Sequence, residues 1–251
     1  MSDPIPVTLR TSGSTGRFLV TVAVVTLSAA LTGVALGLVI VSLLGADAGM
    51  WLVARSSGIT AYLLLTLVTI TGLLLAHPNR SAVRWLSPTA RIRSHVVLTI
   101  FTLAFILVHI VVLALDPWAK VGWAGALLPF GADYRPLPVT LGLLSLWAGL
   151  IAGVSAGFAG RFTGRWWRPL HRLAGVAWIL AWVHGVLAGS DTGPLAAMYA
   201  ITGIAVMTAA AWRYSQARHR TRHPLARPTA VPIEMPRATS LRSGQLTGGP
   251  R

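Results

Sequence analysis

Four histidines lie inside two apolar segments of the chain, where a polar ring is unexpected. His95 and His109 stand fourteen positions apart in the segment from Arg91 to Asp116, and His171 and His184 stand thirteen positions apart in a second segment downstream. An imidazole at membrane depth is costly unless it has a partner. The four rings therefore predict either hydrogen bonds between helices or two pairs of metal ligands.

The composition is that of a polytopic membrane protein. Of 251 residues, 54% are hydrophobic and only 11% are charged, and the mean hydropathy of +0.68 is too high for a soluble domain of this size. Cysteine is absent, which excludes disulfides, thiolate metal sites, iron–sulfur clusters and covalently attached c-type haem. The net charge of +15 falls between and after apolar segments, so membrane topology explains it better than nucleic-acid binding does.

Hydropathy predicts an all-α bundle of six membrane-spanning helices, the first of them uncleaved. We expect this domain over residues 18–213, after a short N-terminal segment, 1–17, and before a basic, disordered tail, 214–251. The expected helices cover residues 18–44, 50–76, 91–116, 139–159, about 171–188 and 194–212.

Two further features concern the surroundings of the fourth expected helix. The aromatic, partly apolar connection over 116–138 is predicted to lie in the membrane interface. Gly149, Gly153 and Gly157 leave a smooth face, which favours close packing of a neighbouring helix, although a flat cofactor could use the same face.

The distribution of positive charge predicts the orientation of the chain. The N-terminal segment, two connections and the tail together hold 18 of the 21 Lys and Arg residues. By the positive-inside rule both termini are then cytoplasmic, and the two histidine-bearing helices run in parallel.

Parallel helices place the histidines at two matching levels. His95 and His171 form what we call the inner pair, and His109 and His184 form the outer pair; the rise of ~1.5 Å per residue separates the levels by about 20 Å. Two imidazoles close both axial positions of a haem iron and favour electron transfer, so each pair predicts the ligands of one b-type haem. No Asp, Glu or Cys is placed at either level to complete a zinc or di-iron site.

The spacing on the second helix does not suit an ideal geometry. At ~100° per residue, fourteen steps bring His109 within about 40° of His95, whereas thirteen steps leave His184 about 140° from His171. We therefore expect tilt, an irregular turn or different directions of approach, with Gly175 a candidate for the weak point.

Haem propionates are anionic and need cationic partners. Arg93, Arg168 and Arg172 lie nearest the inner pair in sequence, and Arg55 and Arg135 are available at the outer side. Arg55 lies just inside an apolar span, which is costly without a partner, although it could instead extend to the interface.

Several other residues carry weaker expectations. Phe105 and Trp178 fall between the two levels, and we expect at least one near the gap between the haems; the alternative is an ordinary core or lipid-facing position. His77, His219 and His223 lie at a helix end or in the tail, and we expect them to be solvated.

Four sequence segments resemble the bacterial ferric reductase-like transmembrane domain family. They are WLVARSSGITAYLLL, the H-x13-H of the third helix, LLPFGADYRPLPVTLG and WRPLHRLAGVAWILAWVHGVLAGSD. The family is related to ferric reductases, to NADPH oxidases and to the haem-binding membrane subunit of the periplasmic methionine sulfoxide reductase system. The resemblance covers about residues 18–213 and implies a bacterial cytoplasmic membrane, transmembrane electron transfer, and b-haem ligation by His95 with His171 and by His109 with His184.

The resemblance also suggests the partners of the chain. Many relatives continue into a cytosolic FAD and NADPH module, whereas the roughly 39 residues after the last expected helix carry no glycine-rich dinucleotide fingerprint. We therefore expect a separate donor, either a flavoprotein or a membrane quinol, and an acceptor outside, either Fe(III) or a periplasmic protein. The alternatives are a haem subunit serving a periplasmic reductase, such as methionine sulfoxide reductase, and a haem-free transporter or structural membrane protein.

Overall fold

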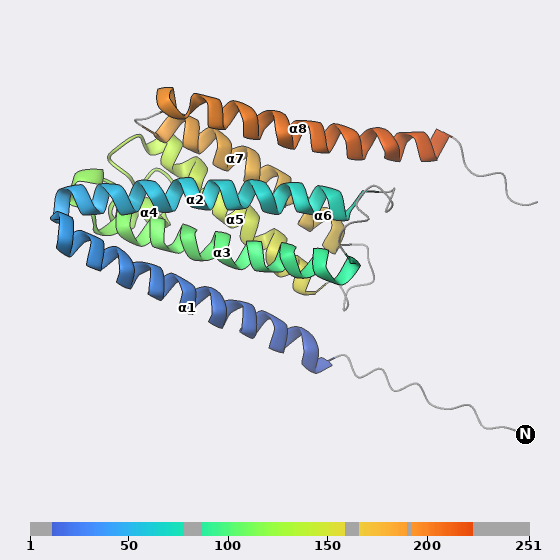
Figure 1. The fold of residues 1–251 in the computed structure, drawn as a ribbon, viewed down its shortest axis with the longest axis horizontal. Helices are drawn as coiled ribbons and strands as arrows, with labels where there is room; N and C mark the ends of the chain where they lie inside the picture. The colour runs from blue at the N-terminus through green and yellow to red at the C-terminus, as the bar shows by residue number, and fades with distance from the viewer. Residues whose placement is uncertain (1–11, 78–86, 159–165, 190–191, 223–251) are drawn as a thin grey trace, which may run out of the picture.

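Figure 1 shows a computed structural model of the chain, which describes residues 12–77, 87–158, 166–189 and 192–222. All regular elements in these residues are helical, and six helical segments among them are long and apolar enough to cross a membrane. This confirms the predicted six-helix, multi-pass bundle. The spans are α1 (Ser12–Leu44), α2 (Ala46–Leu75), α3 (Pro88–Leu115), α5 (Pro136–Gly157), the joined pair α6 (Trp167–His171) and α7 (Leu173–Ala188), and α8 (Thr192–Arg222).

Local sequence signals set several helix ends. Gly45 has a φ of 85°, a conformation that glycine adopts without steric cost, and this allows α2 to follow α1 after a single residue. Ser87 caps α3: its hydroxyl oxygen accepts from the backbone N–H of Ala90 at 3.2 Å, and Pro88 takes the first helical position.

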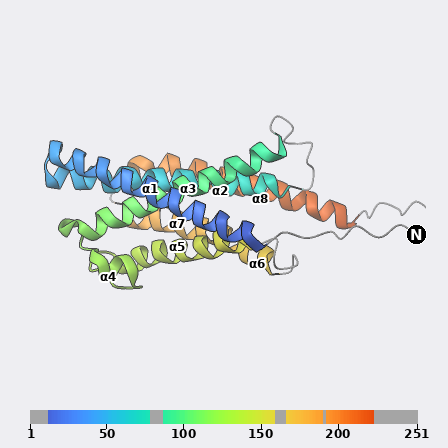
Figure 2. The ribbon, with the colours of Figure 1, turned by 90° about the horizontal axis from the view of Figure 1, so that it is seen from below.

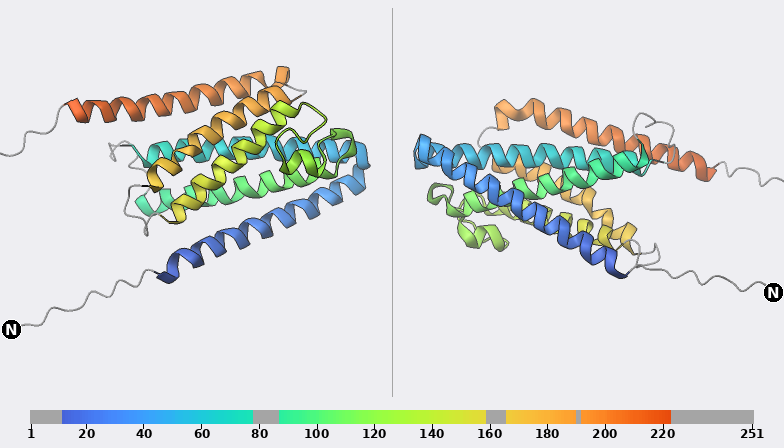
Figure 3. Two further views of the ribbon diagram at one scale, coloured as in Figure 1. Left: turned by 180° about the vertical axis from the view of Figure 1, so that it is seen from behind. Right: turned by 60° about the horizontal axis from the view of Figure 1, so that its bottom comes forward.

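Two helix pairs form the centre of the bundle. α2 packs along α3, and α5 packs along α7. α1 contacts α2 and α3, and α8 contacts α2 and α7, as Figures 1 and 2 show. The start of α1 and the end of α8 lie at the same end of the bundle (Figure 3), as an even number of spans requires.

Small residues fill the interior of the bundle, and large apolar residues lie on its outer surface. The most buried side chains include those of Ala104, Ala152 and Ala177, with exposed fractions of 1–3%, whereas Leu27, Leu43 and many other large apolar residues are exposed. In lipid there is no hydrophobic gain from hiding leucine, so small residues that allow close backbone approach take the interior. This inside-out pattern is that of a membrane bundle.

The connection between α3 and α5, which was predicted to lie in the membrane interface, is partly ordered into short helices. It contains η2 (Pro117–Ala119) and the short helix α4 (Gly122–Leu127). The side chains of Trp118, Trp123 and Phe130 are at least half exposed, as aromatic anchors at a membrane surface would be.

Two expectations about the helices require correction. α8 continues to Arg222, past residue 213, where the tail was expected to begin. The predicted smooth glycine face of α5 is not one interface: a methyl group at Gly149 would meet Ala177 of α7 at 3.8 Å, one at Gly157 would meet Leu19 of α1 at 2.7 Å, and Gly153 has open space. Each step of four residues turns about 40° around the helix, so the three positions face different neighbours.

Candidate functional site

The two histidine-bearing spans face each other across the bundle without close backbone packing. In the described residues, the principal helix contacts join α2 to α3 and α5 to α7, while α3 and α7 are not among the closely packed pairs. The backbones of α3 and α7 are therefore separated by more than the distance of a close helix contact. All four predicted histidines belong to these two spans.

The inner pair comes together as predicted. The ring centroids of His95 and His171 are 6.4 Å apart, with their planes inclined at 68°. An imidazole nitrogen binds a first-row metal at about 2.0 Å and lies about 1.1 Å from its ring centroid, so two axial ligands of one metal have centroids about 6.2 Å apart. The spacing of the inner pair is close to that of two imidazoles bound to one metal ion.

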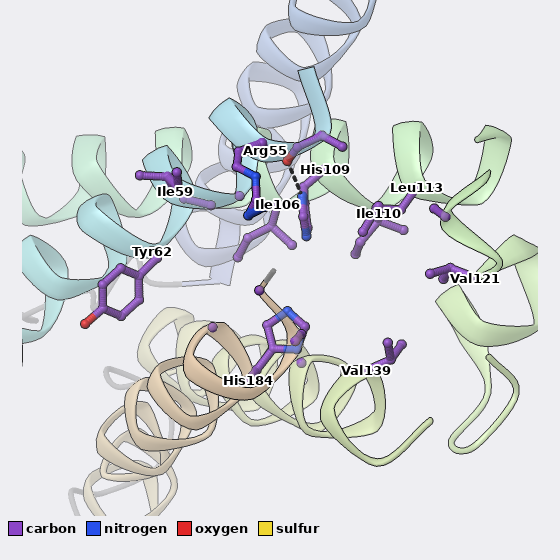
Figure 4. A pocket seen from close by; sticks show the side chains of 18 of the residues that line it. Arg55, Ile59, Tyr62, Ile106, His109, Ile110, Leu113, Val121, Val139 and His184 are labelled. Carbon is purple, nitrogen blue, oxygen red and sulfur yellow. Dashed lines mark hydrogen bonds between the residues drawn. The ribbon is translucent and has the colours of Figure 1, made fainter. Parts of the chain in front are cut away.

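The outer pair faces a large cavity. Figure 4 shows that the rings of His109 and His184 point toward one another from α3 and α7. The cavity has a volume of about 1010 Å³, at the upper end of the ~300–1,000 Å³ typical of cofactor pockets. Its walls are mostly apolar, and besides the two imidazoles its polar lining residues include Arg55, Tyr62, Asp116, Ser145 and Tyr199. The outer level thus has a large, mostly apolar cavity lined by two imidazoles.

Three imidazoles are held by backbone carbonyl groups of the neighbouring helices. Nδ1 of His109 lies 2.8 Å from the carbonyl oxygen of Ala54, that of His184 lies 2.7 Å from Pro138, and that of His171 lies 3.0 Å from Ala152. A carbonyl oxygen can only accept, so Nδ1 carries the proton and donates. In the neutral form of each ring, Nε2 then keeps its lone pair, which is the tautomer that a metal ligand needs.

The fourth imidazole has a side-chain acceptor that serves the same purpose. The hydroxyl of Thr71 donates to the carbonyl oxygen of Val68 at 2.9 Å, and its oxygen lies 3.0 Å from Nδ1 of His95. Because the hydroxyl proton is already used, the Thr71 oxygen accepts from Nδ1–H. His95 is thereby set in the same tautomer as the other three.

The irregular spacing of His171 and His184 is accommodated by an interruption of the helix, one of the possibilities expected. α6 ends at His171 and α7 begins at Leu173, and the N–H of Gly175 donates to the carbonyl of Arg172, three residues back, at 3.0 Å. A three-residue step turns the chain by about 120° per residue instead of about 100°, which reduces the expected mismatch of about 140°. The break lies at Arg172, and Gly175 supplies an N–H to the irregular turn.

The predicted cationic residues do not all lie beside the histidine pairs. At the outer side, Arg55 is half-buried on the cavity wall (Figure 4), with its guanidinium 5.2 Å from the ring centre of Trp51. Arg135 donates instead to the carbonyl oxygen of Leu187 near the end of α7. Of the two, the structure places Arg55 on the wall of the outer cavity.

The arginines expected at the inner side are exposed. Arg93, Arg168 and Arg172 all have exposed side chains, and the guanidinium of Arg168 lies 5.9 Å from the ring centre of Trp167. That ring is in turn 5.9 Å from the ring of His171. Arg168 is thus linked to the inner pair through Trp167.

Trp178 occupies a central position between the two histidine levels. His77 is buried, although it was expected to be solvated. Trp178 is 4% exposed, and its Nε1–H donates to the hydroxyl of Thr66 on α2 at 3.0 Å. His77 was expected to be solvated, but it is 5% exposed and its ring lies 4.2 Å from that of Trp212. The end of α8 covers it. His219 and His223 give no test, because the side-chain surroundings of His219 and all of His223 lie outside what the structure describes.

Sequence reasoning did not identify the groups that orient the histidines. Every residue carries a carbonyl, so Ala54, Pro138 and Ala152 have no side-chain signal that marks them as acceptors. Thr71 is one of several threonines on α2. A weak signal for these acceptors lies in their spacing. Ala54 and Val68 on α2 are as far apart in sequence as His95 and His109 on α3. Pro138 and Ala152 on α5 have the same separation.

Comparisons of the chain with protein-family models, with curated proteins and with solved structures gave no match. Membership of the ferric reductase-like family therefore stays a prediction from the sequence segments quoted above.

Proposed function

We propose that this chain binds two b-type haems, one at each histidine level, and conducts electrons across the membrane between them. The observation that carries the proposal is the common setting of the four imidazoles: they lie at two levels of one bundle, and each has its Nδ1 against an acceptor. A hydrogen bond between helices alone would satisfy one ring with one carbonyl. It would not require two pairs of rings facing each other from α3 and α6–α7.

The residues of the chain take defined roles in this proposal. His95 and His171 would hold the iron of the inner haem, and His109 and His184 would hold the iron of the outer haem. The carbonyl groups and Thr71 fix the tautomer, and Arg55 supplies positive charge beside the outer cavity for an anionic propionate. When bound, haem iron supplies the one-electron redox change, and paired imidazole ligands favour electron transfer over binding of other ligands.

The direction of transfer follows from the predicted topology. With both termini cytoplasmic, electrons enter at the inner level in a bacterial cytoplasmic membrane and leave at the outer level. The donor is a separate flavoprotein or a membrane quinol, and the acceptor is Fe(III) or a periplasmic protein. The activity that this arrangement suits is that of a ferric reductase-like electron carrier.

Purification from cells with ample haem tests the proposal. We expect about two haems per polypeptide and the sharp visible bands of reduced bis-histidine haem. His95→Ala and His171→Ala should each remove the inner haem, and His109→Ala and His184→Ala the outer one. Haem-free protein would refute the proposal and favour a haem-free membrane protein. Variants that all retain full haem content would refute the assignment of these histidines as ligands.

A further inference from the structure

Three of the four imidazoles lie directly against a glycine of the supporting helix. A methyl group at Gly58 of α2 would lie 2.8 Å from Cε1 of His109, and one at Gly142 of α5 would lie 2.9 Å from Cε1 of His184. A methyl group at Gly72 would lie 3.3 Å from Cε1 of His95. Real Cβ contacts are essentially never shorter than 3.0 Å, so the first two positions accept only glycine unless the ring moves.

These glycines share a position relative to the hydrogen-bond acceptors. Gly58 follows Ala54 by four residues, and Gly142 follows Pro138 by four residues. On a helix, a side chain leans toward the N-terminus and covers the turn before its own Cα, so residue i+4 shields the carbonyl of residue i. Glycine at i+4 leaves that carbonyl uncovered, and the imidazole takes the place of the missing side chain.

The same relation holds at the inner level of α2. Gly72 follows Val68 by four residues, and the carbonyl of Val68 holds the hydroxyl of Thr71, which accepts from His95. The separation of Gly58 and Gly72 equals that of His95 and His109 on the facing helix. The helix α2 therefore carries two glycines, Gly58 and Gly72, with the same separation as the two imidazoles that they contact.

We propose that Gly58, Gly72 and Gly142 are positioning residues that seat the haem-ligating imidazoles, an inference that rests on the proposed haem function. A methyl group at any of them crowds the ring and displaces it from its acceptor, more at Gly58 and Gly142 than at Gly72. Each glycine acts on one level only: Gly58 and Gly142 serve the outer pair, and Gly72 serves the inner pair. The fourth acceptor, Ala152, is followed at i+4 by Ala156, whose side chain is exposed, so His171 reaches its carbonyl from another side of the helix.

Glycine-to-alanine variants with a matched control test the proposal. A methyl group at Gly153 of α5 would have open space around it, so Gly153→Ala changes helix propensity without touching an imidazole. We expect Gly58→Ala and Gly142→Ala each to lower the haem content from about two to about one per polypeptide, with the loss at the outer haem, while Gly153→Ala keeps both. Gly72→Ala, with its longer contact, should retain both haems but change the electron paramagnetic resonance signal of the inner one.

A second measurement covers the possibility that Gly58→Ala lowers the yield of folded protein. In a His109→Ala background the methyl group at position 58 has no ring to meet, so the destabilisation caused by Gly58→Ala should vanish in the double variant. If the wild type holds two haems and Gly58→Ala and Gly142→Ala hold two unaltered haems, the positioning role is wrong. It is also wrong if these variants lose both haems alike, or if the thermal destabilisation persists without His109. A wild type without haem instead overturns the proposed function itself.

Discussion

Replacing Thr71 by valine removes the only side-chain acceptor among the four histidine contacts that orient the candidate ligands. Valine has nearly the shape of threonine, but its methyl group cannot accept from Nδ1–H of His95, now 3.0 Å from the Thr71 oxygen. Leaving a buried donor unsatisfied costs about 1–3 kcal/mol. Since about 1.4 kcal/mol corresponds to tenfold in affinity, the inner haem should bind roughly 5- to 150-fold more weakly.

The contacts around Thr71 place the expected loss of inner-haem affinity toward the lower end of this range. The carbonyl of Val68 now accepts from the Thr71 hydroxyl, and in Thr71→Val that carbonyl loses its side-chain donor. His95 already has a hydrogen bond to the backbone of Val68, so its Nδ1–H keeps part of its hydrogen bonding when Thr71 is replaced. We expect a loss of about tenfold, at the lower end of the 10- to 100-fold typical when a partner of a metal-bound histidine is removed.

Haem titration of the apoprotein, followed by redox titration, measures the effect on each level. Thr71→Ser is the matched control, because it keeps the hydroxyl and should bind the inner haem as the wild type does. The outer haem should be unchanged in both variants. Equal affinity of the inner haem in Thr71→Val and Thr71→Ser, or an equal loss at both levels, would refute the assigned tautomer of His95.

Three further predictions concern groups around the imidazoles. Arg55→Gln should weaken binding of the outer haem by about tenfold or more and make its midpoint potential more negative, because a cation beside a propionate is lost. In the same redox titration, Arg55→Lys should restore most of the haem affinity and most of the midpoint potential. Trp178→Phe removes the 3.0 Å bond to Thr66 and should lower the free energy of unfolding by about 0.6 kcal/mol in a detergent unfolding assay, with unchanged stability contradicting it. Ser145→Ala removes the 2.7 Å bond from its hydroxyl to the Ala177 carbonyl and should destabilise the α5–α7 contact by a similar amount, a loss that a Ser145→Thr control should reduce.

Hydropathy and charge were sufficient to predict the six spans, because crossing a bilayer imposes a length and a composition that few other constraints imitate. The parallel direction of the two helices, together with helix rise, predicted that His95 and His171 would share a level, and their rings are 6.4 Å apart. These properties depend on single helices and on their direction, both of which can be read along the chain.

Features that depend on contacts between helices were not predictable in the same way. The acceptors Ala54 and Pro138 contribute backbone atoms, which residue type does not reveal. The burial of His77 depends on the packing of α8 against α2, which places Trp212 beside its ring. The role of Gly58 and Gly142 becomes visible only when the facing rings are in place, since a glycine four residues after an alanine or a proline is common in apolar helices.

The single residue between α6 and α7 makes the two histidine-bearing spans differ in continuity. On α3, His95 and His109 belong to one unbroken helix, so a shift of that helix moves both rings together by the same distance. On the other side, His171 ends a five-residue helix and His184 lies on the separate helix α7. Arg172 keeps helical dihedral angles and is the one residue between these two helices, so the relative placement of His171 and His184 depends on its φ and ψ as well as on the two helices.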